Sequence, residues 1–289
     1  MQKKSYKLLA WVPHLFLFYK EKVFRKLLPI MGVITVYAII IEISFSSTKG
    51  YNLGQFHLIF SFILTIIISF RVNTSYARWW EGRTLWGSIV NNSRNLGLKF
   101  KIYASDLHPD FYLLLGKLPT IIKANLRHDN DLLIKEMLFL GFNDFDLQDN
   151  PVIVVTQRMY FIINQLRDGS IDRMQQCALL DTHLGNLIDM SGGCERIANT
   201  KVPPAYAYFV KQALLFYSVM FPFGWVGTFG ILIIPMMVMI VYILLGLEIL
   251  SEELEEPFRV GDNSLNLDVI TANIEFDIVQ IAKTNNLKL

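Results

Sequence analysis

Four apolar runs divide this sequence into segments suited to lipid and segments suited to water. The runs cover residues 27–45, 53–70, 205–221 and 225–250. About 17 to 20 apolar residues in a helix cross the roughly 30 Å of hydrocarbon in a bilayer. The pattern therefore predicts four transmembrane helices in two hairpins. Lys211 and Gln212 interrupt the third run, and we expect their polar groups to face protein or water.

The segment between the hairpins, residues 73–202, is too polar to cross a membrane. Its apolar residues indicate helices at 79–103, 113–126, 132–141, 152–166 and 173–196. Turn signals separate them at His108-Pro109, Asn150-Pro151 and Asp168-Gly169. With residues 251–289, this segment is predicted to form a helical cytoplasmic region. The expected fold is an all-α membrane protein, and residues 1–289 are interpreted as a single domain.

Basic residues gather on one side of the predicted hairpins. Seven lysines and arginines precede the first run, whereas residues 46–52 contain only Lys49 and residues 222–224 contain none. Arginines and lysines are again frequent after the second run. The positive-inside rule then places both termini in the cytoplasm.

Composition agrees with an integral membrane protein. Hydrophobic residues make up 53% of the chain and charged residues 18%, against about 25% charged in ordinary soluble domains. A net charge of +2 gives no case for a nucleic-acid partner. Cys177 and Cys194 lie outside any metal-binding pattern and are predicted to be reduced, partly buried thiols. No catalytic cluster is present, so we do not expect an enzyme.

Two stripes of residues at spacing i, i+4, i+8 lie within the second run. One is small and polar and the other bulky and apolar: Ser61, Thr65 and Ser69, then Phe62, Ile66 and Phe70. A small polar stripe usually packs closely against another membrane helix. A bulky apolar stripe usually faces lipid or a protein core. The sharper alternative is a set of apolar rings that gate ion flow by dewetting. Phenyl edges would make such rings more tolerant of anions than of cations.

Aromatic and charged residues crowd together just after the second run. They are Arg71, Arg78, Trp79, Trp80, Glu81, Arg83 and Trp86. Trp and Arg often collect at the depth of the lipid head groups. Here their density exceeds what such a belt requires, and the spacing of Glu81 from its basic neighbours suggests ion pairing.

With three further segments, this cluster resembles the bestrophin family, especially its bacterial and plant-chloroplast branch. The other segments are residues 19–24, residues 202–206 with Pro203-Pro204, and residues 251–258 with Glu255-Glu256-Pro257-Phe258. The resemblance covers residues 19–268. It implies a homopentameric channel for chloride or other monovalent anions, in membrane lipid, with one central pore. A bacterial inner membrane is the expected location.

The resemblance also implies two constrictions. The three pore-neck residues of the family correspond to Phe62, Ile66 and Phe70, so it selects the bulky stripe. The cytoplasmic aperture corresponds to Val210 as first choice and Gln212 as second. Alternatives stay open: a sodium-selective channel of the same fold, or a secondary transporter, for which Pro235 offers one possible helix break.

The acidic segment after the fourth run has two interpretations. Ser251 can cap a helix whose first turn carries Glu252 and Glu253. Animal bestrophins form a calcium clasp after the corresponding Pro-Phe. The candidate ligands or gating residues here are Glu252, Glu253, Glu255, Glu256, Asp262 and Asp268. Because this set is depleted in carboxylates after Phe258, no cofactor is expected, with calcium as the alternative.

Two other residues stand at the outer end of the hairpins. His57 lies beside the outer end of the second run and could titrate at the pore entrance, although a head-group contact is the simpler interpretation. Gly224 is a small residue at the entry to the fourth run, most simply for close packing.

Overall fold

The computed structural model describes residues 22–45, 53–104 and 108–283. These ranges are helical apart from short turns, and no strand occurs among them, which confirms the all-α prediction. Residues 19–21 of the first family segment, and Lys49, lie outside the described residues.

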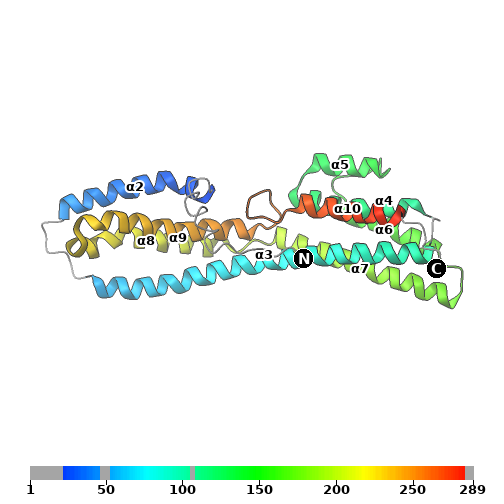
Figure 1. Cartoon of the computed structure of the whole chain (residues 1–289), viewed down its shortest axis with the longest axis horizontal. Helices are drawn as coiled ribbons and strands as arrows, with labels where there is room; N and C mark the ends of the chain where they lie inside the picture. Colours follow the sequence, from blue (N-terminus) through cyan, green and yellow to red (C-terminus); the bar gives the residue numbers. More distant parts are fainter. Residues whose placement is uncertain (1–21, 46–52, 105–107, 284–289) are drawn as a thin grey trace, which may run out of the picture. The chain divides into compact units, whose positions relative to one another are not determined.

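The chain divides into two compact units. The first comprises Met1–Tyr76 and Val202–Glu255, and the second comprises Ala77–Lys201 and Glu256–Leu289. The sequence shows no boundary here because α3 (Gly54–Ala104) is one unbroken helix that continues from the first unit into the second (Figure 1). The interpretation of residues 1–289 as a single channel domain stays a prediction.

The first unit contains the apolar helices. They are α2 (Lys22–Phe45), the beginning of α3, α8 (Pro204–Phe229) and α9 (Ile233–Glu255). Among the described residues, three stretches of helix are long and apolar enough to cross a membrane: α2, α3, and the α8–α9 segment taken together. Their shared core includes Ala38, Leu64, Leu214 and Met237. The chain therefore has the apolar helices of an integral membrane protein.

The turn between α8 and α9 lies later than the apolar pattern predicts. Pro222, in the expected link at 222–224, is inside α8, and the chain turns at η2 (Gly230–Leu232). Gly230 has a φ of 50°, a region that glycine enters without steric cost. Lys211 of α8 pairs with Glu252 of α9, so the two helices run antiparallel. The predicted link was wrong because a proline can stay within a membrane helix.

The start of α9 also bears on the transporter alternative. Pro235 lies in the first turn of α9, where a proline leaves no helical hydrogen bond unmade. The helix break expected for a transporter is therefore missing at this position.

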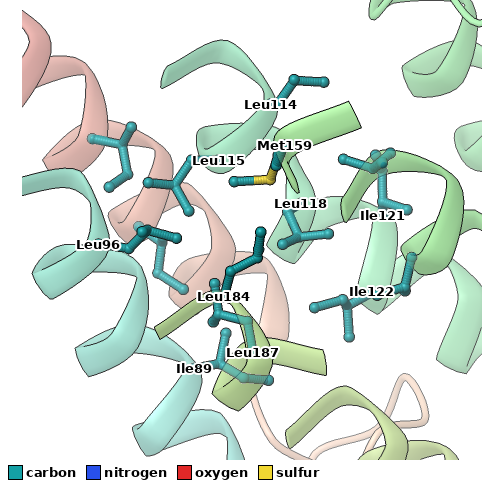
Figure 2. Close-up of a cluster of buried hydrophobic side chains, with 14 of the residues drawn as sticks. Ile89, Leu96, Leu114, Leu115, Leu118, Ile121, Ile122, Met159, Leu184 and Leu187 are labelled. Atoms are coloured by element: carbon teal, nitrogen blue, oxygen red, sulfur yellow. The ribbon is translucent and has the colours of Figure 1, made fainter. Parts of the chain in front are cut away.

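The second unit is built around α4 (Pro109–Arg127). Figure 2 shows Leu114, Leu115 and Leu118 of α4 among side chains from α3, α6 (Pro151–Gln165) and α7 (Ile171–Asn199). The remaining helices are α5 (Asn130–Phe139) and α10 (Leu267–Lys283). Four of the five helices predicted for this region are confirmed within a few residues, as α4 to α7. The fifth, predicted at 79–103, is not a separate helix but the second half of α3, which begins at Gly54. A separate helix α10 was not predicted.

Side-chain caps explain why these helices begin where they do. Asp129 accepts a hydrogen bond from the backbone N–H of Leu132 at the start of α5. Asn150 caps α6 and Ser170 caps α7 in the same way. Cys177 and Cys194 of α7 are free thiols, and both are fully buried, where partial burial was predicted.

Candidate functional site

The beginning of α3 has two faces of different character. One face is buried in the first unit and consists of His57, Leu64, Ile68, Arg71 and Ser75. The other is exposed: Phe62 has 67% of its surface accessible, Ile66 42% and Phe70 63%. At about 100° per residue, the centres of the two faces are about 180° apart around the helix. The bulky stripe therefore points away from the rest of its own unit.

The small polar stripe lies between these two faces. Ser61 donates to the carbonyl of Leu58, at 3.0 Å, and Thr65 donates to that of Ser61, at 2.8 Å. Thr65 and Ser69 are exposed. The expected close packing of this stripe is therefore not made inside the first unit.

Arg71 is the centre of a buried ion-pair network. Its guanidinium, 1% exposed, donates from Nε to Glu248 Oε2 at 3.2 Å and from Nη2 to Glu248 Oε1 at 3.4 Å. Nη1 donates to Glu255 Oε1, which also accepts from Ser75 at 3.3 Å. Bidentate pairing fixes an arginine in direction as well as in distance. This network therefore ties α3 to α9 one residue beyond Phe70.

Glu248 was not identified from the sequence. The sequence nevertheless contained a signal for it, because Glu248 lies inside the fourth apolar run and a carboxylate there is costly unless it has a partner. Arg71, the first basic residue after the second run, was the available counterion.

The acidic segment does not begin a helix as predicted. Ser251 lies within α9 and donates to the carbonyl of Leu247 at 2.8 Å. Glu252 and Glu253 consequently lie near the C-terminal end of α9, where the helix dipole disfavours carboxylates. Basic residues offset this cost, since Lys211 pairs with Glu252 and Lys26 pairs with Glu253 at 2.8 Å.

The structure changes the preference between the two aperture residues. Val210 is fully buried in the core of the first unit, together with Leu214. Gln212 is exposed. A side chain without accessible surface cannot line a passage in this conformation, so Gln212 replaces Val210 as the candidate.

In the second unit, the aromatic and basic cluster forms hydrogen bonds to distant parts of the chain. Arg78 Nη2 donates to the carbonyl of Ile197 at 2.6 Å, and Trp79 Nε1 donates to that of Asn263 at 3.0 Å. Glu81 pairs with Arg196 at 2.6 Å. The basic partner expected for Glu81 therefore comes from α7.

The other members of the cluster differ in exposure. Trp86 is fully buried in the core of the second unit, while Trp80 and Arg83 are exposed. The cluster therefore serves packing and helix attachment at several positions rather than forming one belt.

The two most specific family segments meet at Gly82. A Cβ atom on Gly82 would lie 3.1 Å from two ring carbons of Phe258 and 3.3 Å from Pro257. Such distances are tighter than normal packing allows. The Pro-Phe pair and the Arg-Trp-Trp-Glu segment therefore form one close contact, in which a larger residue at position 82 would have to displace Phe258 and Pro257 by a few tenths of an ångström.

The candidate calcium ligands are mostly committed to basic residues. Asp268 accepts from Lys123 at 2.9 Å and from Arg127 at 2.9 Å, and these two bonds hold the pKa of its carboxyl below the ordinary value. Glu256 pairs with Lys201 and Arg259, each at 3.1 Å.

No group of three or more metal-ligating side chains occurs in the described ranges. Calcium needs several oxygen ligands around one point, so these residues do not fit a calcium site. The absence of a cofactor stays a prediction.

Comparison with known families gives one match along almost the whole chain. The family model described as bacterial/fungal bestrophin protein matches residues 2–280. A voltage-dependent anion channel-forming protein of Mesorhizobium japonicum is 31% identical over 278 residues, which cover 92% of this chain and 88% of the relative. A protein of the same description from Ralstonia nicotianae is 30% identical over 221 residues, 73% of this chain and 72% of the relative.

Solved structures show the same fold. A variant of a bacterial bestrophin homologue from Klebsiella pneumoniae superposes with a TM-score of 0.78 at 26% identity, over 89% of this chain and 99% of that chain. A structure described as a membrane protein gives a TM-score of 0.81 at 24% identity, over 90% of this chain and all of that chain.

Proposed function

This chain belongs to the bacterial/fungal bestrophin family, and from that premise we propose that it forms a channel for chloride or other monovalent anions. The names of its relatives in Mesorhizobium and Ralstonia support a channel that passes anions. The apolar helices of the first unit support its place in a membrane.

The observation that carries the proposal is the exposed apolar face of α3. When several copies of α3 surround one axis, each buried face turns outward to its own protomer. Phe62, Ile66 and Phe70 then turn inward and form three stacked apolar rings. Such a neck controls conduction by dewetting. The positive edges of the phenyl rings favour anions in it.

The small polar stripe supports this arrangement. Ser61, Thr65 and Ser69 lie beside the neck face, where a neighbouring α3 would approach in a ring. Small residues allow membrane helices to come close together. The hydroxyls of Ser61 and Thr65 donate to backbone carbonyls of their own helix, and Thr65 and Ser69 are exposed. The stripe is therefore available for contact between copies.

The family and the charge pattern support a specific assembly and topology. We assign four transmembrane helices per protomer, with α8 and α9 as the second hairpin, in a homopentamer. The basic residues at the start of α2 support an orientation with both termini on the cytoplasmic side of a bacterial inner membrane. Gln212 is assigned to the cytoplasmic aperture.

Planar-bilayer recording of the purified protein in asymmetric sodium chloride tests the proposal. Unitary currents that reverse near the chloride equilibrium potential are expected. Ile66→Phe should reduce conductance and Phe70→Ala should raise it, because they narrow and widen the neck. Ile243→Phe on α9 is the matched control, because 45% of the Ile243 surface is accessible, nearly the same fraction as for Ile66. This substitution should leave conductance unchanged.

Three outcomes would overturn parts of the proposal. Reversal near the sodium potential would show a cation channel of the same fold. A saturable, ion-coupled flux without unitary currents would indicate a transporter. Equal effects of Ile66→Phe and Ile243→Phe would place the bulky stripe against lipid.

A further inference from the structure

His57 is a buried imidazole in the first turn of α3. Only 2% of its surface is accessible. Neither ring nitrogen has a hydrogen-bond partner within the described part of the chain. A neutral imidazole carries one N–H donor and one acceptor, and leaving both unused in a protein interior is unfavourable. A histidine at this position therefore calls for an explanation beyond packing.

An aromatic cage surrounds the ring. The ring centroids of Phe56, Tyr217, Phe221 and Trp225 lie 5.8, 6.0, 5.9 and 6.2 Å from that of His57. Phe56 belongs to α3 and the other three belong to α8. Aromatic faces attract a cation but accept no conventional hydrogen bond. The cage therefore tolerates a proton on the ring without satisfying the two N–H groups that result.

Gly224 of α8 closes the remaining side of the cage. A Cβ atom on Gly224 would collide with Cδ2 and Nε2 of His57. The imidazole thus lies directly against the α8 backbone and cannot move further toward it. Any change that enlarges the ring's surroundings must separate α3 from α8 here.

We propose that His57 is a proton-binding site that couples acidification to closure of the neck, an inference that rests on the proposed channel function. His57 lies at the centre of the buried face of α3, about 180° around the helix from Phe62, Ile66 and Phe70. A displacement of the N-terminal end of α3 away from α8 therefore moves Phe62, the nearest of the three, toward the pore axis, while the Arg71 network holds the other end of the stripe.

Protonation of His57 causes this displacement of α3 from α8. The imidazolium has two N–H donors, and among the described ring contacts of His57, Tyr217 of α8 is the one titratable neighbour. The N-terminal end of a helix also disfavours a positive charge. Water must enter the cage to satisfy the donors, and it separates α3 from α8.

Currents at two pH values test the site. In planar bilayers with both chambers brought from about pH 7 to about pH 5, the range in which histidine titrates, wild-type current should fall by about tenfold. His57→Gln and His57→Phe should carry the same current at both pH values. His108→Gln is the control, because His108 lies in the second unit outside the cage and the variant should respond as wild type does.

A second readout works without conduction. Trp225 lies beside His57, and an imidazolium quenches indole emission. The tryptophan fluorescence of the detergent-purified full chain should fall between the same pH values in wild type, and His57→Gln should lose that part of the change. A fluorescence change identical in both proteins would overturn the proton site. A pH-dependent current that persists in both His57 variants would overturn its link to the neck, whereas absence of current at neutral pH in wild type would refute the channel itself.

Discussion

Phe70 and Arg71 are consecutive residues of α3 with opposite surroundings. The Phe70 ring is exposed, while the Arg71 guanidinium is buried against Glu248 and Glu255 of α9. A rotation of α3 that moved Phe70 would have to break the buried ion pairs one residue later. The network therefore fixes the direction in which the inner end of the apolar stripe points.

Removing Arg71 should destabilise the first unit. Arg71→Ala leaves two carboxylates without their buried counterion, which costs about 3–5 kcal/mol. Arg71→Lys should lose less, because an ammonium keeps a charge but cannot form the bidentate pair. Thermal unfolding of the purified protein in detergent measures both.

The control is a more exposed ion pair. Arg94 pairs with Asp277 at 2.6 Å, and nearly half of the Arg94 side chain is accessible. Arg94→Ala should cost no more than about 1 kcal/mol. If Arg71→Ala and Arg94→Ala lower the stability equally, the buried network does not stabilise the first unit more than an exposed ion pair would.

Gly82→Ala should destabilise the second unit. Alanine normally favours a helix over glycine by about 0.5–1 kcal/mol, but here the new methyl group meets Phe258 and Pro257. Overpacking of this kind costs about 1–3 kcal/mol. Gly192→Ala on α7 is the matched control, since nothing lies within 4 Å of its Cβ position, and it should raise the melting temperature. Stabilisation by both changes would contradict the close contact.

Asp268 should stabilise the fold at neutral pH and not in acid. Its folded pKa is lowered, first by the hydrogen bond from Lys123 and then by that from Arg127. The contribution is thus present above the unfolded pKa of about 4 and is lost as pH falls through the lower folded value. Because the carboxylate is 60% exposed, the gain is at most about 1 kcal/mol.

Melting curves of Asp268→Asn across pH check this dependence. The deficit relative to wild type should shrink below about pH 4. In a Lys123→Met, Arg127→Met background, the Asp268 substitution should have almost no further effect. A deficit that is constant with pH would refute the ion-pair origin.

The Cys194 thiol should be inert in the folded protein. Burial, with smaller contributions from the charges of Glu195 and Glu81, raises its pKa to about 12. The reactive thiolate is therefore almost absent at neutral pH. Mass spectrometry after maleimide treatment should find Cys194 unmodified before denaturation and modified after it. Thr182→Cys, an exposed position on the same helix, should react at once.

Local patterns predicted the fold well where a local cause decides it. Asn150 and Ser170 have the side chains that begin a helix, and both do so. The turn predicted at Pro222 was wrong, because a proline that marks a turn in water does not necessarily end a helix in lipid, where the backbone keeps its own hydrogen bonds. Gly230, eight residues later, makes the turn instead.

The candidate site was predictable only in part. The spacing of Phe62, Ile66 and Phe70 was visible, but which face of α3 is buried depends on contacts with α8 and α9. Ser251 was wrongly expected to begin a helix, and the burial of Val210 was not foreseen, for the same reason: the end of α9 and the inner face of α8 are decided by packing between distant segments. The ion pair of Arg71 with Glu248 joins residues 177 positions apart, so no local pattern reveals it.

The late turn at Gly230 makes α8 longer than the hydrocarbon core of a bilayer is thick. With 26 residues, α8 extends about 39 Å, and α9 with 23 residues extends about 35 Å, against about 30 Å of hydrocarbon. A turn at residues 222–224 would have left the third helix near 26 Å, short enough to thin the lipid around it. The observed hairpin must instead tilt or carry its acidic end beyond the hydrocarbon. Hydrophobic mismatch thus becomes part of the protein's energetics, and lipid chain length determines how far the Lys211–Glu252 pair stands in water.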